Sequence, residues 1–268
     1  MQLREDSRDE QRIGSRELTH WPTRLGRGMV RLARALAGTF SANAVLVVTA
    51  VVGGLLVLGL TGAGVAVYDA VAENDGLAAF DRPALMEAMS LRSPGLDRFL
   101  TGFTHLGGPA GMSIIASIVT ALMVWRWRSR TPLVLMLTAV AGSLLITILG
   151  KASVSRVRPP LVDAVPPYEH SFSFPSGHAL NSTVIAGLVA YLILRRLASA
   201  LQRGLVVGLA VLWAVSIGLS RVFLGHHWLT DVMFGWVIGL AWLAVVITAH
   251  RLFLTVRRAR PPAGHTTG

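Results

Sequence analysis

Hydrophobic residues gather in six long stretches of the chain, and short segments that carry the charged residues separate them. The stretches cover residues 43–67, 108–125, 133–149, 177–194, 204–219 and 229–249. A helix that crosses the hydrocarbon core of a bilayer needs about 20 apolar residues, with a range of about 17–25. The first and last stretches reach that length unaided, whereas the middle four need flanking residues or little tilt. The pattern predicts an all-α integral membrane protein, a bundle of six transmembrane helices.

The composition agrees with a membrane protein and excludes other classes. Hydrophobic residues make up 53% of the chain and charged residues only 15%, and the mean hydropathy is +0.57. A soluble globular domain carries about 25% charged residues, so this chain lacks the charge to cover a surface in water. It is also too apolar to be disordered. Because it has no cysteine, a disulfide scaffold and thiolate metal sites are excluded.

The charges between the apolar stretches predict the orientation in the membrane. An even number of spans puts both termini on one side, and 18 of the 25 lysines and arginines lie on that side. Positively charged loops stay in the cytoplasm, so we expect both termini there. The orientation in the membrane then explains the net charge of +11, and we expect no binding to nucleic acid.

The chain before the first span has a helical pattern of its own. Its arginines are spaced as one helical face and its apolar residues as another: Arg24, Arg27, Arg31 and Arg34, against Leu25, Met29, Leu32, Leu36 and Phe40. We interpret this as an interfacial amphipathic helix on anionic headgroups, with a solvated cytoplasmic helix as the alternative. The predicted organisation is a cytoplasmic tail (1–42), a six-helix membrane domain (43–250) and a basic cytoplasmic tail (251–268).

Unusual polar residues lie in three segments at the outer ends of predicted spans. The segments contain Lys151, Arg156, Arg158 and Pro159, then Pro175, Ser176, Gly177 and His178, and then Ser220, Arg221, His226, His227 and Asp231. Cations gathered beside a membrane with few acidic partners are costly. The simplest explanation is that the missing anion is the ligand, and a phosphate or diphosphate fits. An alternative is that the arginines only anchor the protein at the outer leaflet.

The residue types suit phosphate binding. Arginines offer forked donors to phosphate oxygens, and a lysine adds a point charge. Ser176, Gly177 and His178 are expected to begin a helix whose free N–H groups attract an anion. The alternative is that Ser176 only caps that helix.

A histidine and an aspartate at the start of the last span have the spacing of a nucleophile and its orienting residue. His227 and Asp231 lie four residues apart, so they share a helical face. A carboxylate on one ring nitrogen leaves the other free to attack. His178, expected at the same depth, can serve as the general acid. Spacing alone does not choose between His227 and His226, and a purely structural pair is the alternative.

Together these residues carry a resemblance to a known family. Lys151-x6-Arg158-Pro159, Pro175-Ser176-Gly177-His178 and Ser220-Arg221-x5-His227-x3-Asp231 resemble the tripartite signature of the type 2 phosphatidic acid phosphatase superfamily. The order and spacings match at every signature position. The resemblance covers about residues 43–250 and leaves the N-terminal 42 residues outside.

The resemblance implies a mechanism and a class of substrate. His227 is expected to attack phosphorus, Asp231 to orient it, and His178 to protonate the leaving oxygen and then activate water. The residues implied in phosphate binding are Lys151, Arg158, Ser176, Gly177 and Arg221. We expect a phosphatase without metal or cofactor, because fixed cations can hold the phosphate and the sequence offers no carboxylate cluster for a metal. The charge count puts the site on the outer face of the membrane, which we expect to be the plasma membrane. The substrate is expected to be a lipid phosphate: a polyprenyl diphosphate, phosphatidic acid or phosphatidylglycerophosphate.

Other functions fit the pattern less well. A membrane anion transporter or a phospholipid-binding scaffold would also use cations and histidines, but it predicts charges deep in the spans. A vanadate-dependent oxidase of the same superfamily is disfavoured by the six apolar spans. The oligomeric state and the natural lipid stay open.

Overall fold

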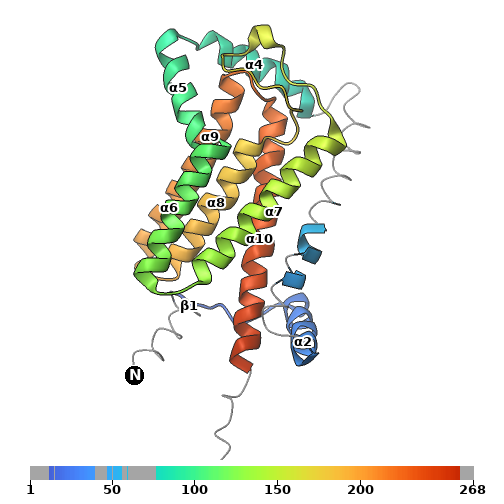
Figure 1. Ribbon diagram of the computed structural model, residues 1–268, viewed down its shortest axis with the longest axis vertical. Helices are drawn as coiled ribbons and strands as arrows, with labels where there is room; N and C mark the ends of the chain where they lie inside the picture. The colour runs from blue at the N-terminus through green and yellow to red at the C-terminus, as the bar shows by residue number, and fades with distance from the viewer. Residues whose placement is uncertain are drawn as a thin grey trace, which may run out of the picture.

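The computed structural model describes residues 12–14, 16–39, 47–49, 51–55, 59 and 77–259 of the 268-residue chain. Its main elements are helices, and five of them are long and apolar enough to cross a membrane. These are α6 (Pro109–Trp127), α7 (Thr131–Val154), α8 (Gly177–Leu194), α9 (Ala200–Phe223) and α10 (Leu229–Ala259). They run side by side in one bundle (Figure 1).

The five helices confirm five of the six predicted spans, and the structure makes most of them longer than the apolar stretches. α7, for example, continues past residue 149 through Lys151 to Val154. Backbone hydrogen bonds continue a helix beyond the last apolar residue, so hydropathy alone underestimates its length. The predicted first span, residues 43–67, lies largely outside the described residues, so six spans and the position of the termini stay predictions.

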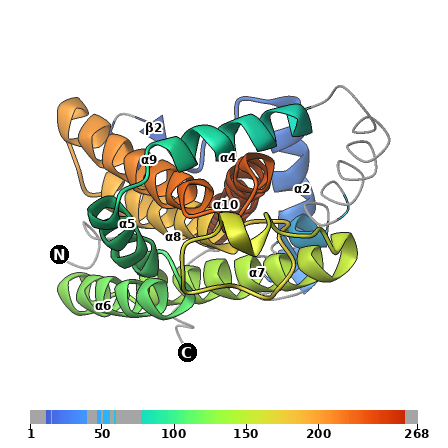
Figure 2. The same ribbon diagram turned by 90° about the horizontal axis from the view of Figure 1, so that it is seen from above.

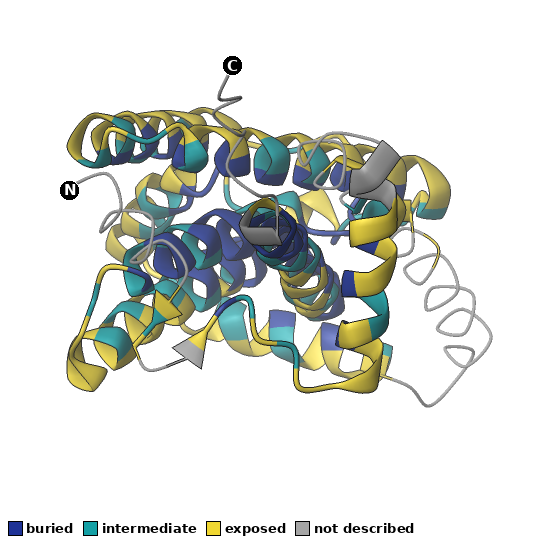
Figure 3. Ribbon diagram, turned by 90° about the horizontal axis from the view of Figure 1, so that it is seen from below, coloured by how far each residue is buried: buried dark blue, intermediate teal, exposed yellow. Residues whose placement is uncertain are grey.

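α8 lies at the centre of the bundle and α10 packs closely against it. Figure 3 shows the buried residues concentrated on the central helices, with exposed residues on the outer faces. Gly235 and Gly239 of α10 permit this approach, because a Cβ on Gly235 would lie 2.9 Å from the Ser176 carbonyl oxygen. A Cβ on Gly239 would lie 3.0 Å from the carbonyl oxygen of Leu180. The start of α10 is therefore held against the start of α8, where two of the predicted site segments lie.

One end of the bundle is covered by short elements (Figure 1). They are η1 (Leu77–Phe80), α4 (Asp81–Ser90), α5 (Pro94–Leu106) and, in the loop between α7 and α8, η2 (Leu161–Asp163). Seen from above, α4 crosses the ends of α9 and α10, and α5 lies between α6 and α9 (Figure 2). All three predicted site segments lie at this end, so the covering elements can contribute side chains to the site.

At the opposite end, the N-terminal segment packs against α10. It contains a short hairpin, β1 (Arg12–Ile13) and β2 (Arg16–Glu17), and the helix α2 (Arg24–Thr39). Val30 and Ala33 of α2 are buried against α10, while Leu25 and Leu32 stay 76% and 63% exposed. The predicted helix is present, and its leucines remain available to a membrane. Its location at the headgroups stays a prediction.

Candidate active site

The structure brings His227 rather than His226 to the carboxylate of Asp231. Nδ1 of His227 lies 3.5 Å from Oδ2 of Asp231, which belongs to the first turn of α10. His226 points elsewhere, with its Nε2 2.7 Å from the carbonyl oxygen of Val165. His227 is 1% exposed and Asp231 is fully buried. The geometry thus resolves a choice that residue spacing left open.

Several donors fix the Asp231 carboxylate in place. Oδ2 accepts the backbone N–H of Trp228 at 2.9 Å and also the hydroxyl of Ser173. Oδ1 accepts Nη1–H of Arg156 at 2.6 Å. With this many donors, the carboxylate can hold the neighbouring imidazole in one orientation. A carboxylate beside Nδ1 favours the tautomer with the proton on Nδ1, so the unprotonated nitrogen of His227 is Nε2, which can accept the Nη1–H of Arg158.

Nε2 of His227 faces the cationic part of the site. Nη1 of Arg158 lies 3.2 Å from this nitrogen. Burial, followed by the charges of Arg158 and Arg221, lowers the pKa of His227 below its ordinary value of 6.5. The imidazole is therefore neutral at neutral pH, as a nucleophile must be.

A carboxylate that the sequence analysis did not single out bridges the two arginines of the site. Glu169, in the loop between α7 and α8, pairs with Arg158 at 2.8 Å through Oε2 and with Arg221 through Oε1. Burial acts to raise the pKa of Glu169, but Arg221 and Arg158 outweigh it and bring the pKa to about 2. The two arginines thus already hold one anionic group between them.

Arg221 and Lys151 complete the cationic surface. Arg221 is only 2% exposed and donates through Nη1 to the hydroxyl of Thr104 at 3.3 Å. Its Nε–H is buried and has no acceptor within the part of the chain that the structure describes. Lys151 donates to the Ser171 hydroxyl at 3.3 Å and to the carbonyl of Phe172. The charges of both residues act on His227 and contribute to the lowering of its pKa.

His178, the second residue of α8, lines a cavity of about 490 Å³ together with Arg221 and Glu169. Among the residues that the structure describes, no hydrogen-bond partner of its imidazole is found. Gly108 leaves room beside the ring, because a Cβ there would lie 3.2 Å from Nε2 of His178. Both ring nitrogens are therefore free to exchange a proton with a bound molecule.

The structure gives Ser176 the role of helix cap. It precedes α8 as the N-cap, is fully buried, and its hydroxyl accepts the N–H of Ala179 at 3.5 Å. The expected helix start at Gly177 is thus present. A contact of Ser176 or Gly177 with phosphate stays a prediction. In residues 77–259 and the described N-terminal parts, no three His, Asp or Glu side chains gather as a metal site would need.

Sequence reasoning did not predict the contacts of three residues that hold the site together. Arg156 was counted among the cations that suit a phosphate, with an outer-leaflet anchor as the alternative, whereas in the structure it contacts Asp231. The spacing of Arg156 and Arg158 could have indicated this role. Residues two apart in an extended segment point to the same side, and Arg158 was already a predicted site residue. Ser173 and Glu169 belong to an irregular loop whose contacts follow no periodicity, so no local pattern identified them.

Comparison with known proteins gives consistent results. The family model of the PAP2 superfamily matches residues 132–254, a range that contains every predicted site residue. Phosphatidylglycerophosphatase B of Bacillus subtilis (strain 168) is 35% identical over 154 residues, which are 57% of this chain and 74% of that protein. The crystal structure of a transmembrane PAP2-type phosphatidylglycerolphosphate phosphatase from Bacillus subtilis is similar, with a TM-score of 0.61 and 29% identity. The likeness covers 73% of this chain and 92% of that one.

Proposed function

Because this chain belongs to the PAP2 superfamily and is a membrane phosphatase, we propose that it hydrolyses the phosphate ester or diphosphate of a lipid through a phosphohistidine intermediate. The observation that carries the proposal is the buried His227–Asp231 pair, whose unprotonated imidazole nitrogen lies beside the cation of Arg158. A nucleophile, its orienting group and an anion site meet there, as phosphoryl transfer requires.

Binding comes first. The phosphoryl group takes the position between Arg158 and Arg221, where Glu169 lies in this structure. The Nε–H of Arg221, which has no acceptor among the described residues, supplies a further donor, and Lys151 adds charge. Fixed cations stabilise the negative charge on the equatorial oxygens of the transition state. This role does not require a metal ion, and we expect none.

Two phosphoryl transfers follow, the first to His227 and the second to water. Nε2 of His227 attacks phosphorus, a P–N bond forms, and the bond from phosphorus to the lipid oxygen breaks. His178 gives that oxygen its proton, while Asp231 stabilises the positive imidazole of the intermediate. His178 then takes a proton from water, the resulting hydroxide attacks phosphorus, and the P–N bond breaks. Inorganic phosphate leaves, and each residue regains its starting protonation state.

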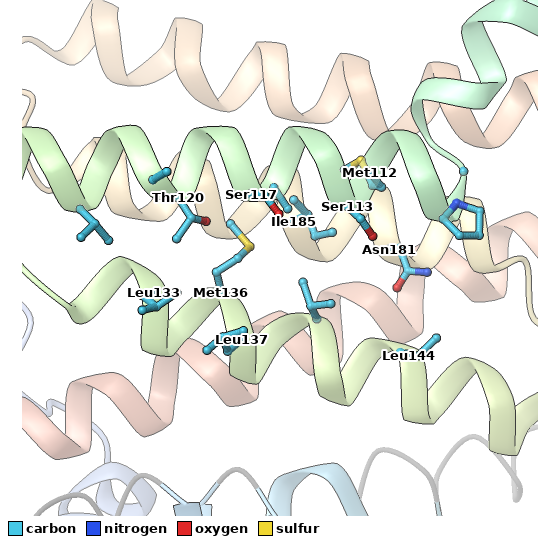
Figure 4. Close-up of a pocket in the computed structure, with 16 residues that line it drawn as sticks. Met112, Ser113, Ser117, Thr120, Leu133, Met136, Leu137, Leu144, Asn181 and Ile185 are labelled. Carbon is cyan, nitrogen blue, oxygen red and sulfur yellow. The ribbon is translucent and has the colours of Figure 1, made fainter.

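An apolar groove beside the site favours a lipid as the substrate. It has a volume of about 520 Å³ and lies between α6 and α7, where side chains of the two helices face one another (Figure 4). Gly108 and Pro109 line both this groove and the cavity that contains His178. A lipid with its phosphate at His178 would therefore have a path for an acyl or prenyl chain along Met112 and Met136.

We also propose that the protein has six spans and lies in the plasma membrane with both termini in the cytoplasm and the site outside. The charge distribution supports this orientation, since 18 of the 25 basic residues lie in the segments assigned to the cytoplasm. Phosphatidylglycerophosphate is the favoured substrate, because the Bacillus subtilis relative is a phosphatidylglycerophosphatase. Phosphatidic acid and polyprenyl diphosphate share the phosphate that the site would bind.

The purified protein in detergent should release phosphate from at least one of these three lipids, and EDTA should not reduce the rate. The reason is that arginines and a lysine, rather than a metal ion, neutralise the phosphate. Released phosphate is measured for each lipid with and without EDTA. The fastest lipid identifies the substrate class. A folded protein that releases nothing from any lipid would favour a transporter or scaffold instead, and inhibition by EDTA would contradict metal independence.

The activity should persist at mildly acidic pH. Because the pKa of His227 lies below 6.5, Nε2 stays unprotonated and able to attack as the pH falls to about that value. The acid limb of kcat/KM, which reports the free enzyme, should therefore lie below pH 6.5. The substrate phosphate itself ionises at about pH 6. Its titration is therefore measured separately, and the pH profile of kcat/KM is corrected for it. A corrected limb at or above 6.5 would contradict the description of the His227 environment.

A further inference from the structure

Asp81 is a buried carboxylate that lies outside the matched family region yet contacts the back of the candidate active site. It begins α4, one of the helices that cover this end of the bundle, and is 4% exposed. Its Oδ1 accepts the backbone N–H of Thr230 at 2.8 Å, and its Oδ2 accepts the Thr230 hydroxyl at 2.7 Å. The same Oδ2 lies 2.7 Å from Nη2 of Arg156. Asp81 thus connects α4 to the first turn of α10.

Arg156 carries this connection to the catalytic pair. Its Nη2 is bound by Asp81, and its Nη1 donates to Oδ1 of Asp231 at 2.6 Å. Burial acts to lower the pKa of Arg156, but Asp231 and Asp81 raise it above its ordinary value. The guanidinium is therefore a permanent charge held between two carboxylates. Its plane also lies over the Trp228 ring, 5.8 Å from the centroid.

We propose that Asp81 is a positioning residue for the nucleophile His227 and that it acts through Arg156 and Asp231. The proposal rests on the proposed function, since it assigns Asp81 a role in the same reaction. Asp81 binds Nη2 of the guanidinium, Nη1 donates to Oδ1 of Asp231, and Oδ2 of Asp231 is the oxygen on the side of His227.

The charges along this chain of contacts explain why a second carboxylate is needed. Arg156 alone would neutralise Asp231 and reduce its ability to stabilise a positive imidazole. Arg156 forms ion pairs with both Asp81 and Asp231. One positive and two negative charges leave these three residues with a net negative charge beside His227. A positive imidazole forms when Nε2 bonds to phosphorus, and that is the state a negative neighbour stabilises.

Asp81 could also serve only to join α4 to α10, and the two roles predict different results. If Asp81 were a structural link alone, its loss would lower the stability of the protein while the folded enzyme kept its kcat. A positioning residue instead affects the transition state, so kcat falls while KM, set by the phosphate-binding cations, does not change. The division between kcat and KM therefore separates the roles.

The test is Asp81→Asn, which keeps an oxygen for the Thr230 N–H but removes the charge that holds Arg156. We expect kcat to fall by about 10–100-fold with KM unchanged, an effect typical of a small misplacement of a reacting group. Asp81→Glu should restore part of the loss. Glu87→Gln is the matched control, since it removes an exposed carboxylate from the same helix and should keep the wild-type kcat.

The outcomes distinguish this inference from the proposed function. A folded Asp81→Asn enzyme with wild-type kcat, or one that loses only stability, would overturn the role of Asp81 and leave the phosphohistidine mechanism intact. If His227→Ala keeps wild-type activity, the mechanism itself fails, whatever Asp81 does. If Asp81→Asn does not fold, Asp81→Glu decides: a lowered kcat with unchanged KM supports positioning, and wild-type kcat overturns it.

Discussion

Replacing His227 with alanine should reduce phosphate release by a factor on the order of 10³ or more, the size of effect that loss of a nucleophile has in other covalent enzymes. Within the described residues, this imidazole has Nδ1 beside an orienting carboxylate and an unprotonated Nε2 beside the cation of Arg158. Without it, the carboxylate of Asp231 has no imidazole to orient, and the proposed covalent intermediate should not form. Substrate binding should persist, because the cations remain.

The prediction can be tested directly by measuring the phosphate that is covalently bound to the protein. Lipid labelled with ³²P in the phosphate is mixed with protein and quenched in alkali, which preserves phosphohistidine. Wild-type protein should retain the label and His227→Ala should not. His170→Ala is a suitable control, since His170 is an exposed histidine in the loop between α7 and α8. Equal phosphate release by wild type and His227→Ala would refute the assignment of the nucleophile.

His178→Gln should slow hydrolysis of a lipid phosphate by about 10²–10⁴-fold, the usual contribution of a general acid or base. The lipid alkoxide is a poor leaving group and needs the proton of His178. An aryl phosphate such as p-nitrophenyl phosphate leaves without a proton, so its first transfer should proceed in the variant. The second transfer still lacks a base, and phosphoenzyme should therefore accumulate.

A burst of p-nitrophenol followed by slow turnover would reveal this accumulation. The expected amplitude is one equivalent per active enzyme molecule. The double variant His178→Gln/His227→Ala serves as the control and should give neither burst nor label. If the single variant turns over both substrates at the wild-type rate, His178 has no role in proton transfer.

The sequence predicted the parts of this fold that depend on local chemistry. Apolar stretches indicated the helices α6 to α10, because burial in lipid depends on each residue's own hydropathy. Ser176 before Gly177 marked the start of α8 through an N-cap, which acts over one helical turn. The pairing of His227 with Asp231 followed from a four-residue spacing, but the exclusion of His226 depended on a contact with Val165, which lies far away in the sequence.

The helices α4 and α5, which cover one end of the bundle, include a contact that local sequence patterns could not predict. The segment before α6 contains none of the residues that the sequence analysis singled out. In the structure it forms α4 and α5, and α5 begins at Pro94 after an N-cap in which Ser93 accepts the Leu96 N–H at 3.3 Å. That signal was available. The contact of Asp81 with Arg156 could not be predicted from the sequence, since the two residues are 75 positions apart and neither belongs to a periodic pattern.

Glu169 has a consequence for the end of the reaction cycle. A carboxylate tethered to the same chain as Arg158 and Arg221 acts as a ligand of high effective concentration, in the millimolar range for short flexible links. Inorganic phosphate formed in the site would have to compete with this tethered ligand to remain bound. The loop between α7 and α8 would thus assist product release, and the enzyme could hold its substrate with strong cations without retaining its product.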